Sequence, residues 1–207
     1  MITVDDVLAM LLWGTIGFLS GSLMFAYWLG QLALKRDIRA VGDGNPGTTN
    51  LLKAGGIAWG GLAMMFEITK GALPVGLARW VFGLDGLPLL VAALAPVLGH
   101  AFSPFMNFRG GKAVAVTGGV WIGLTLWEVP LIGMIALVIA FALTETSGYA
   151  IAATILTVLL YLLVSPAEGL LVIIWVLNSA LLLWKYRRDF SGPPRARGWL
   201  RRRLKRA

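Results

Sequence analysis

Residues 7–34 read VLAMLLWGTIGFLSGSLMFAYWLGQLAL, an apolar run that contains no Asp, Glu, Lys or Arg. A helix needs about 20 apolar residues to cross the roughly 30 Å hydrocarbon core of a bilayer, so this run is long enough to span one. The rest of the chain has the same character, because 58% of the 207 residues are hydrophobic and only 14% are charged. Soluble domains carry about 25% charged residues, and we therefore predict an integral membrane protein.

Further apolar runs give about seven predicted membrane-spanning helices, at residues 7–34, 56–82, 86–100, 112–127, 129–143, 149–164 and 167–184. Several runs are short or interrupted by Gly and Pro, so tilted, broken or partly re-entrant helices are expected. The acidic start of the chain, with Asp5 and Asp6, does not resemble a secretory signal, so the first span is expected to stay in the mature protein. The sequence predicts an all-α membrane domain over residues 1–184 and a basic tail over residues 185–207.

The basic residues predict the orientation of these spans. Sixteen of the eighteen Lys and Arg fall in loops on one side or in the tail, with Lys35, Arg36, Arg39, Lys53, Arg109 and Lys112 in the loops. Because cytoplasmic loops are rich in Lys and Arg, the N-terminus is predicted outside and the C-terminus in the cytoplasm. We expect the tail to contact anionic membrane lipids and not nucleic acid, since no interleaved aromatic residues suggest a base-stacking platform.

The rarest residue types exclude several kinds of chemistry. The chain has no Cys and a single His. Disulfides and thiolate nucleophiles are therefore excluded, and a zinc or di-iron centre is disfavoured. We expect neither a metal nor another cofactor.

Residues 42–50 read GDGNPGTTN and lie behind the first apolar run. Such a polar, glycine-rich turn ahead of a helix is suited to bind an anion, because backbone N–H groups and the positive end of the helix dipole point toward it. An ordinary helix-initiating turn has the same composition, so the nonapeptide alone leaves both interpretations open.

Residues 99–115, GHAFSPFMNFRGGKAVA, combine the only His with a second candidate anion site. Gly110 and Gly111 allow successive N–H groups to converge, and Arg109 and Lys112 add charge near a helix start. Met106 and Ala113 do not fit the nucleotide-binding pattern GxxxxGK[ST], so a nucleoside triphosphatase is disfavoured. The alternative is that these basic residues only enforce topology.

Glu67 and Lys70 are charged residues inside the second predicted span. They stand three apart and so share one helical face, where a neutralising ion pair is the least costly arrangement. Lys70 is followed by Gly71 and Pro74, where the helix can open and the ammonium group can reach a phosphate. Structural pairing and phosphate binding both remain open.

Together these segments resemble the acyl-phosphate-dependent glycerol-3-phosphate acyltransferases (PlsY) of bacterial phospholipid synthesis. The resemblance rests on Gly21-Ser22 with Tyr27 and Gly30, on DIRAVGDGNPGTTNLLKAGG, on Glu67-Lys70-Gly71-Pro74, and on GHAFSPFMNFRGGKAVA. Members of this family have seven transmembrane helices, with these motifs at the cytoplasmic face of the bacterial inner membrane. The resemblance implies transfer of a fatty acyl group from acyl phosphate to the sn-1 hydroxyl of glycerol 3-phosphate, by a monomer or weak homo-oligomer that uses no cofactor.

The resemblance also implies roles for individual residues. The acyl-phosphate head is expected to bind Asn45, Gly47, Thr48, Thr49 and Asn50. Glycerol 3-phosphate is expected to bind Lys53, Lys70, Arg109, Gly110, Gly111 and Lys112. His100 is expected to orient or deprotonate the attacking hydroxyl, although a structural role is open and the departing phosphate can itself accept the proton. Ser147, or alternatively Thr146, is expected to stand in for the serine of the family's cytoplasmic loop after the fifth span.

This chain departs from the family at several of these positions. Asp43, which we count with His100 and Ser147 among the catalytic candidates, replaces a Ser, and Lys53 replaces an Arg. The terminal family motif, with an Arg-His pair and Asn, is replaced by Lys185, Tyr186 and Asp189. These changes leave open a divergent paralogue that uses another acceptor or only binds lipid or acyl phosphate. A small transporter with Glu67 and Lys70 along its path is a weaker alternative, since no inverted repeat is visible.

Overall fold

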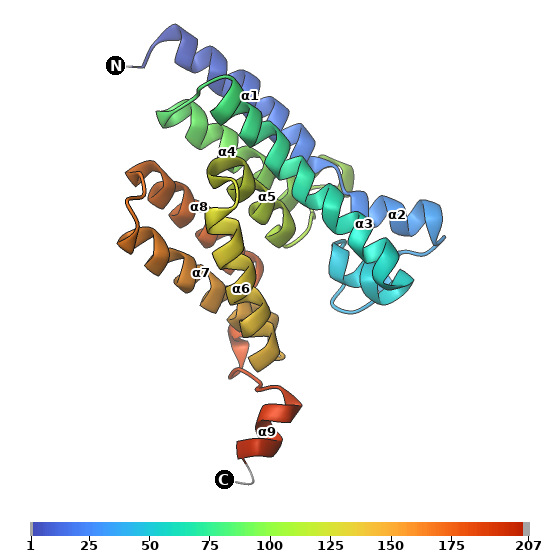
Figure 1. Ribbon diagram of the computed structural model, residues 1–207. Helices are drawn as coiled ribbons and strands as arrows, with labels where there is room; N and C mark the ends of the chain where they lie inside the picture. The colour runs from blue at the N-terminus through green and yellow to red at the C-terminus, as the bar shows by residue number, and fades with distance from the viewer. Residues whose placement is uncertain (1, 205–207) are drawn as a thin grey trace. The chain divides into compact units, whose positions relative to one another are not determined.

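The computed structural model describes residues 2–204, and apart from one isolated β-bridge its regular elements are helical in that range. The helices, drawn in Figure 1, are α1 (Val4–Ser22), α2 (Phe25–Ala33), α3 (Thr48–Gly76), α4 (Gly86–Ala101), α5 (Val114–Thr125), α6 (Glu128–Leu143), α7 (Ser147–Val164), α8 (Gly169–Lys185) and α9 (Gly198–Leu204). Short helical turns are η1 (Ile38–Ala40), η2 (Leu77–Val81), η3 (Pro104–Met106) and η4 (Arg187–Ser191).

Each predicted span overlaps an apolar helix. Within residues 2–204, four helical stretches are long and apolar enough to cross a membrane, namely Val4–Ala33, Thr48–Val81, Gly86–Met106 and Ser147–Val164. Three shorter apolar helices lie at Val114–Thr125, Glu128–Leu143 and Gly169–Lys185. The prediction of an all-α fold is confirmed, whereas the number of crossings and the orientation of the termini stay predictions.

The predicted helix at residues 7–34 is not continuous. It is divided into α1 and α2, because Leu23 leaves helical geometry with φ −66° and ψ 120°. Backbone groups freed by the break meet charged side chains of α3, since Lys70 donates to the Leu23 carbonyl and the Ala26 N–H donates to Glu67. A helix can be broken at membrane depth when the backbone groups freed by the break have hydrogen-bond partners within the protein, as they do here.

The second predicted span, residues 56–82, starts later than the helix in the structure. We placed its start at residue 56, but α3 begins at Thr48, directly behind the glycine-rich nonapeptide. Gly56 has φ 79° and marks a kink inside α3. The polar residues before the kink belong to the first turns of the helix, where polar side chains are common.

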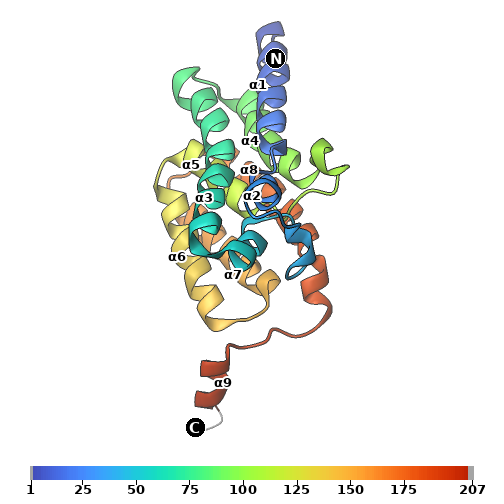
Figure 2. The ribbon, with the colours of Figure 1, turned by 90° about the vertical axis from the view of Figure 1, so that its right-hand side faces the viewer.

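The chain divides into two compact units, Met1–Leu126 and Trp127–Ala207. In the first unit, α1 packs on α4, and α3 packs on both α2 and α5 (Figure 2). Two of these contacts bring backbones close together, because a Cβ at Gly21 would overlap the Pro96 carbonyl and a Cβ at Gly119 would overlap the Ile68 carbonyl. Small residues at helix interfaces are typical of membrane proteins.

In the second unit, α7 packs between α6 and α8. The loop after α6 pairs with the segment before α9: Thr144 and Ala196 form the antiparallel bridge, and the Arg197 N–H donates to the Leu143 carbonyl at 2.8 Å. The start of α7 is held by the Asp189 carboxylate, which accepts from the Gly148 N–H at 2.7 Å. Part of the basic tail is therefore tied to the end of α6.

Candidate active site

The first glycine-rich loop is organised around Asp43. Gly42 and Gly44, on either side of it, have φ values of 65° and 76°, in the left-handed region that glycine adopts without steric cost. The Asp43 carboxylate accepts from the Asn45 N–H at 3.2 Å and from the Asn50 side-chain amide at 3.0 Å. The buried Asn50 amide also donates to the Asn45 carbonyl at 2.8 Å. Side-chain hydrogen bonds thus define this loop.

The loop leads into a helix whose first N–H groups receive no side-chain cap. Gly47 is the N-cap residue of α3, and Thr48 and Thr49 form its first turn. The first N–H groups of any helix lack partners within the helix, and the dipole makes that end attractive to anions. The start of α3 is therefore a candidate phosphate site, and this assignment stays a prediction.

The second loop, between η3 and α5, has an unusual backbone. Asn107, Phe108 and Ala113 all have positive φ values, between 50° and 64°. Such conformations cost non-glycine residues on the order of 1–3 kcal/mol each, so surrounding contacts must maintain them. One such contact is the Gly111 N–H, which donates to the His100 carbonyl at 3.0 Å. The loop is anchored to the end of α4.

The two loops meet through a salt bridge. Lys112 Nζ lies 2.9 Å from Asp43 Oδ2, and the exposed fractions of these side chains are 22% and 49%. Burial by itself raises the pKa of the Asp43 carboxyl, but the hydrogen bonds from Lys112, Asn45 and Asn50 and the charge of Lys112 outweigh it. The pKa of Asp43 therefore lies below its usual value, and the group is ionised at neutral pH.

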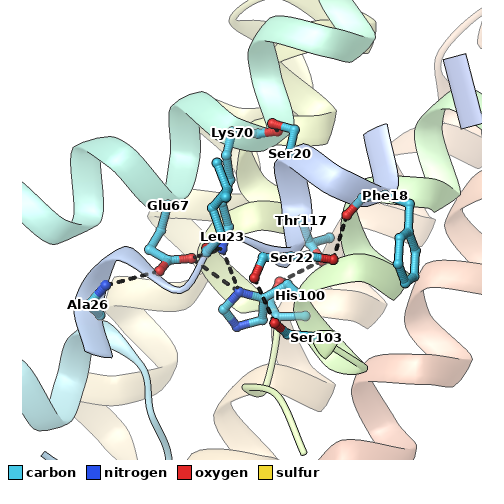
Figure 3. A network of polar contacts seen from close by, with 11 residues as sticks. Phe18, Ser20, Ser22, Leu23, Ala26, Glu67, Lys70, His100, Ser103 and Thr117 are labelled. Atoms are coloured by element: carbon cyan, nitrogen blue, oxygen red, sulfur yellow. Dashed lines mark hydrogen bonds and ion pairs between the residues drawn. The ribbon is translucent and has the colours of Figure 1, made fainter. Parts of the chain in front are cut away.

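A cluster of three charged or titratable side chains lies beneath the surface, and Figure 3 shows them pointing toward one another. Glu67 Oε2 is 2.6 Å from Lys70 Nζ and 3.1 Å from His100 Nδ1. Lys70 Nζ is also 2.9 Å from His100 Nδ1. The exposed fractions are 1% for Glu67, 4% for Lys70 and 5% for His100. We refer to these three residues as the buried cluster.

The buried cluster connects four segments of the first unit. It accepts and donates hydrogen bonds at the break between α1 and α2, as described above, and its members come from α3 and α4. Two hydroxyls reinforce the same junction: Ser20 Oγ donates to the Lys70 carbonyl at 2.8 Å, and Ser103 Oγ donates to the Ser22 carbonyl at 2.7 Å. Figure 3 includes both serines. Hydrogen bonds between polar groups thus hold this junction together.

The remaining predicted site residues fall into two places. Lys53 and Arg109 are exposed on the first unit, and Gly110 and Gly111 precede Lys112 in the second loop. Ser147 is the first residue of α7 and belongs to the second unit. Sequence reasoning treated Glu67 only as a partner of Lys70, and it missed that Glu67 also contacts His100. Its lone acidic charge inside an apolar span was the available signal.

Comparison with known proteins identifies the family. A family model described as glycerol-3-phosphate acyltransferase matches residues 11–192. The chain belongs to this family. A glycerol-3-phosphate acyltransferase of Pseudomonas aeruginosa is 39% identical over 173 residues, which cover 83% of this chain and 89% of that protein. Glycerol-3-phosphate acyltransferase 1 of Thermotoga maritima is 42% identical over 120 residues, covering 57% of this chain and 59% of that protein.

Solved structures of the family support the fold as well. The glycerol 3-phosphate form of PlsY (YgiH), an integral membrane glycerol 3-phosphate acyltransferase, is similar with a TM-score of 0.81 and 28% identity. That match covers 93% of this chain and 97% of the other. The lysophosphatidic acid form matches with a TM-score of 0.76 and 27% identity over 87% of this chain and 89% of the other. Membership of the family and its integral membrane fold confirm the resemblance inferred from the motifs.

Proposed function

We propose that this protein transfers a fatty acyl group from acyl phosphate to the sn-1 hydroxyl of glycerol 3-phosphate at the cytoplasmic face of a bacterial inner membrane. The observation that carries the proposal is the contact between its two glycine-rich loops, made by Asp43 and Lys112, in a chain of the glycerol-3-phosphate acyltransferase family. A reaction with two phosphate-bearing substrates requires two anion sites close together, and these loops supply candidates for both.

The two loops offer complementary donors for the two phosphates. The start of α3 offers backbone N–H groups at Gly47, Thr48 and Thr49, with Asn45 and Asn50 shaping the loop, to the acyl-phosphate head. Glycerol 3-phosphate is assigned to Gly110, Gly111 and Lys112 together with Arg109 and Lys53. Arg109 adds the planar fork that suits phosphate oxygens, whereas Lys53 acts as a point charge.

The reaction needs orientation and charge stabilisation more than a covalent nucleophile. The acceptor oxygen forms a bond to the acyl carbonyl carbon, the bond between that carbon and the bridging phosphate oxygen breaks, and inorganic phosphate leaves. Acyl phosphate is already activated, so positioned cations and N–H donors that stabilise the developing charge are sufficient. We assign the hydroxyl proton to the departing phosphate, which can accept it as it leaves. The role of Ser147 stays a prediction.

One observation favours a second candidate, a paralogue on the same scaffold with another acceptor. Asp43 already places a carboxylate on Lys112, where a substrate phosphate would bind. An acceptor with less negative charge would be repelled less strongly than glycerol 3-phosphate. Glu67 and Lys70 form an ion pair with each other within the buried cluster. No observation therefore favours the transporter.

The test is phosphate release from palmitoyl phosphate by the detergent-purified protein, with and without glycerol 3-phosphate. Lysophosphatidic acid is detected by mass spectrometry. We expect product only when the acceptor is present, and we expect Lys112→Ala to abolish it. Acyl-phosphate binding without acceptor-dependent product would instead favour the paralogue, and a panel of neutral glycerol-like acceptors would then identify its substrate.

A further inference from the structure

The buried cluster lies directly behind the second glycine-rich loop. The Nδ1 edge of the His100 ring faces Glu67 and Lys70, and its Nε2 edge faces Gly111, where a Cβ would overlap Nε2. The His100 carbonyl accepts from the Gly111 N–H at 3.0 Å. Both the ring and the backbone of His100 therefore support the same glycine.

The contacts of the cluster fix the orientation of the His100 ring through its Nδ1 edge. Lys70 Nζ is engaged by Glu67, by His100 and by the Leu23 carbonyl. Whichever tautomer His100 adopts, Nδ1 is occupied by a proton shared with Glu67 or Lys70. A buried charged pair is costly, so its presence here suits a part that must not move.

We propose that Glu67, Lys70 and His100 are positioning residues: Glu67 and Lys70 fix the His100 ring, and the ring holds the Gly110-Gly111 turn in the shape that binds the phosphate of glycerol 3-phosphate. This inference rests on the proposed function for the identity of the ligand. Misplacement of a binding group by about 1 Å can cost about 10²-fold in a reaction of this kind, so a rigid support behind a glycine turn has a large effect.

The test is a double-mutant cycle between His100 and Gly111, with Gly110 as the matched control. His100→Asn keeps a polar group near Nδ1 and removes the atoms that face Gly111. Gly111→Ala places a methyl group against the ring, whereas a methyl group at Gly110 meets the His100 backbone carbonyl, which His100→Asn leaves in place. The effect of Gly111→Ala should therefore depend on whether the His100 ring is present, whereas the effect of Gly110→Ala should not.

We expect Gly111→Ala to raise the KM for glycerol 3-phosphate at least tenfold in the native background and less than threefold in His100→Asn. Gly110→Ala should raise this KM by the same factor in both backgrounds. Equal factors for Gly111→Ala in both backgrounds would overturn the proposal. A factor for Gly110→Ala that is also smaller in His100→Asn than in the native background would overturn it too.

The split between kcat and KM separates positioning from proton transfer. In His100→Asn and in Glu67→Gln we expect a raised KM for glycerol 3-phosphate, an unchanged KM for palmitoyl phosphate, and a kcat within about threefold of the native value. Loss of a general base lowers kcat by about 10²- to 10⁴-fold, and that result with an unchanged KM would make His100 a reacting group. If His100→Asn does not fold, His100→Ala, which removes the ring and keeps the Glu67–Lys70 pair, supplies the same comparison.

Failure of the proposed function is distinguishable from failure of this inference. If the native protein binds glycerol 3-phosphate calorimetrically but forms no product, the cycle is measured on the Kd for glycerol 3-phosphate, with the same expected factors. Coupling in Kd supports the positioning cluster in the absence of acyl transfer. A native protein that neither reacts with nor binds glycerol 3-phosphate overturns both.

Discussion

The ammonium group of Lys112 lies 2.9 Å from the carboxylate of Asp43, so each of the two glycine-rich loops contributes one charge to a single pair. Both side chains keep partial access to solvent, and exposed pairs of this kind contribute about 0–1 kcal/mol. A phosphate with about two negative charges can displace such a carboxylate from Lys112. If Lys112 binds the substrate phosphate as proposed, Asp43 competes with that phosphate for it.

Asp43→Ser should lower the KM for the phosphate substrate that binds Lys112. Removing a competing interaction of about 1 kcal/mol corresponds to about a fivefold lower KM. Steady-state kinetics with both substrates varied measure the effect. Asp37→Ser is the control, because Asp37 pairs with Arg39 at the start of η1, where both side chains are exposed, and its loss should leave both KM values unchanged. A loss of activity in Asp43→Ser would mean that the carboxylate takes part in the reaction.

The Asp43 pair should weaken only in acid. Its pKa is lower in the folded protein than its ordinary value of 3.8, so its stabilising effect is present above pH 3.8 and is lost as the pH falls through the folded pKa. The difference in Tm between the native protein and Asp43→Ser should be constant from about pH 5 to 8 and shrink below about pH 4. Thermal unfolding in detergent measures it, and a difference that fades near pH 6 would contradict the assignment.

Glu67→Ala should destabilise the fold strongly. The substitution leaves the Lys70 ammonium buried without its counter-charge, which typically costs about 3–5 kcal/mol. Tm and chemical unfolding in detergent test this result. Glu145→Ala is the matched control, since Glu145 pairs with Arg201 where both side chains are exposed, and its removal should change stability by less than about 1 kcal/mol. Equal effects of the two substitutions would show that burial does not govern these ion pairs.

Gly119→Ala and Gly118→Ala should have opposite outcomes although the two glycines are neighbours in α5. A methyl group at Gly119 meets the Ile68 carbonyl of α3, whereas one at Gly118 has no atom within 4 Å. We expect Gly119→Ala to lower Tm as the helices are forced apart. Gly118→Ala should leave Tm unchanged or raise it, since Ala is favoured over Gly in a helix by about 0.5–1 kcal/mol. A tolerated Gly119→Ala would contradict the close approach of α3 and α5.

Local sequence was sufficient to predict the all-α fold and the positions of its apolar helices. Apolar length and glycine-rich turns are local properties, because a bilayer requires about 20 apolar residues per helix wherever they stand in the chain. The same reasoning predicted a span at residues 7–34 and the possibility of broken helices, but not the position of the break in this span. The break after Ser22 is held by Glu67 and Lys70, whose contribution depends on how α3 packs and is not written in the broken segment itself.

The sequence by itself determined the all-α membrane class, the order of the family motifs, and the placement of Asp43 and Lys112 in polar loops. Only the tertiary structure decided that these two residues pair, and that His100 is buried between Glu67 and Gly111. The physical reason is that hydrophobicity and turn propensity act along the chain. Pairing and burial instead depend on which helices pack together, and the close contacts of α3 with α5 and of α1 with α4 bring distant segments into reach.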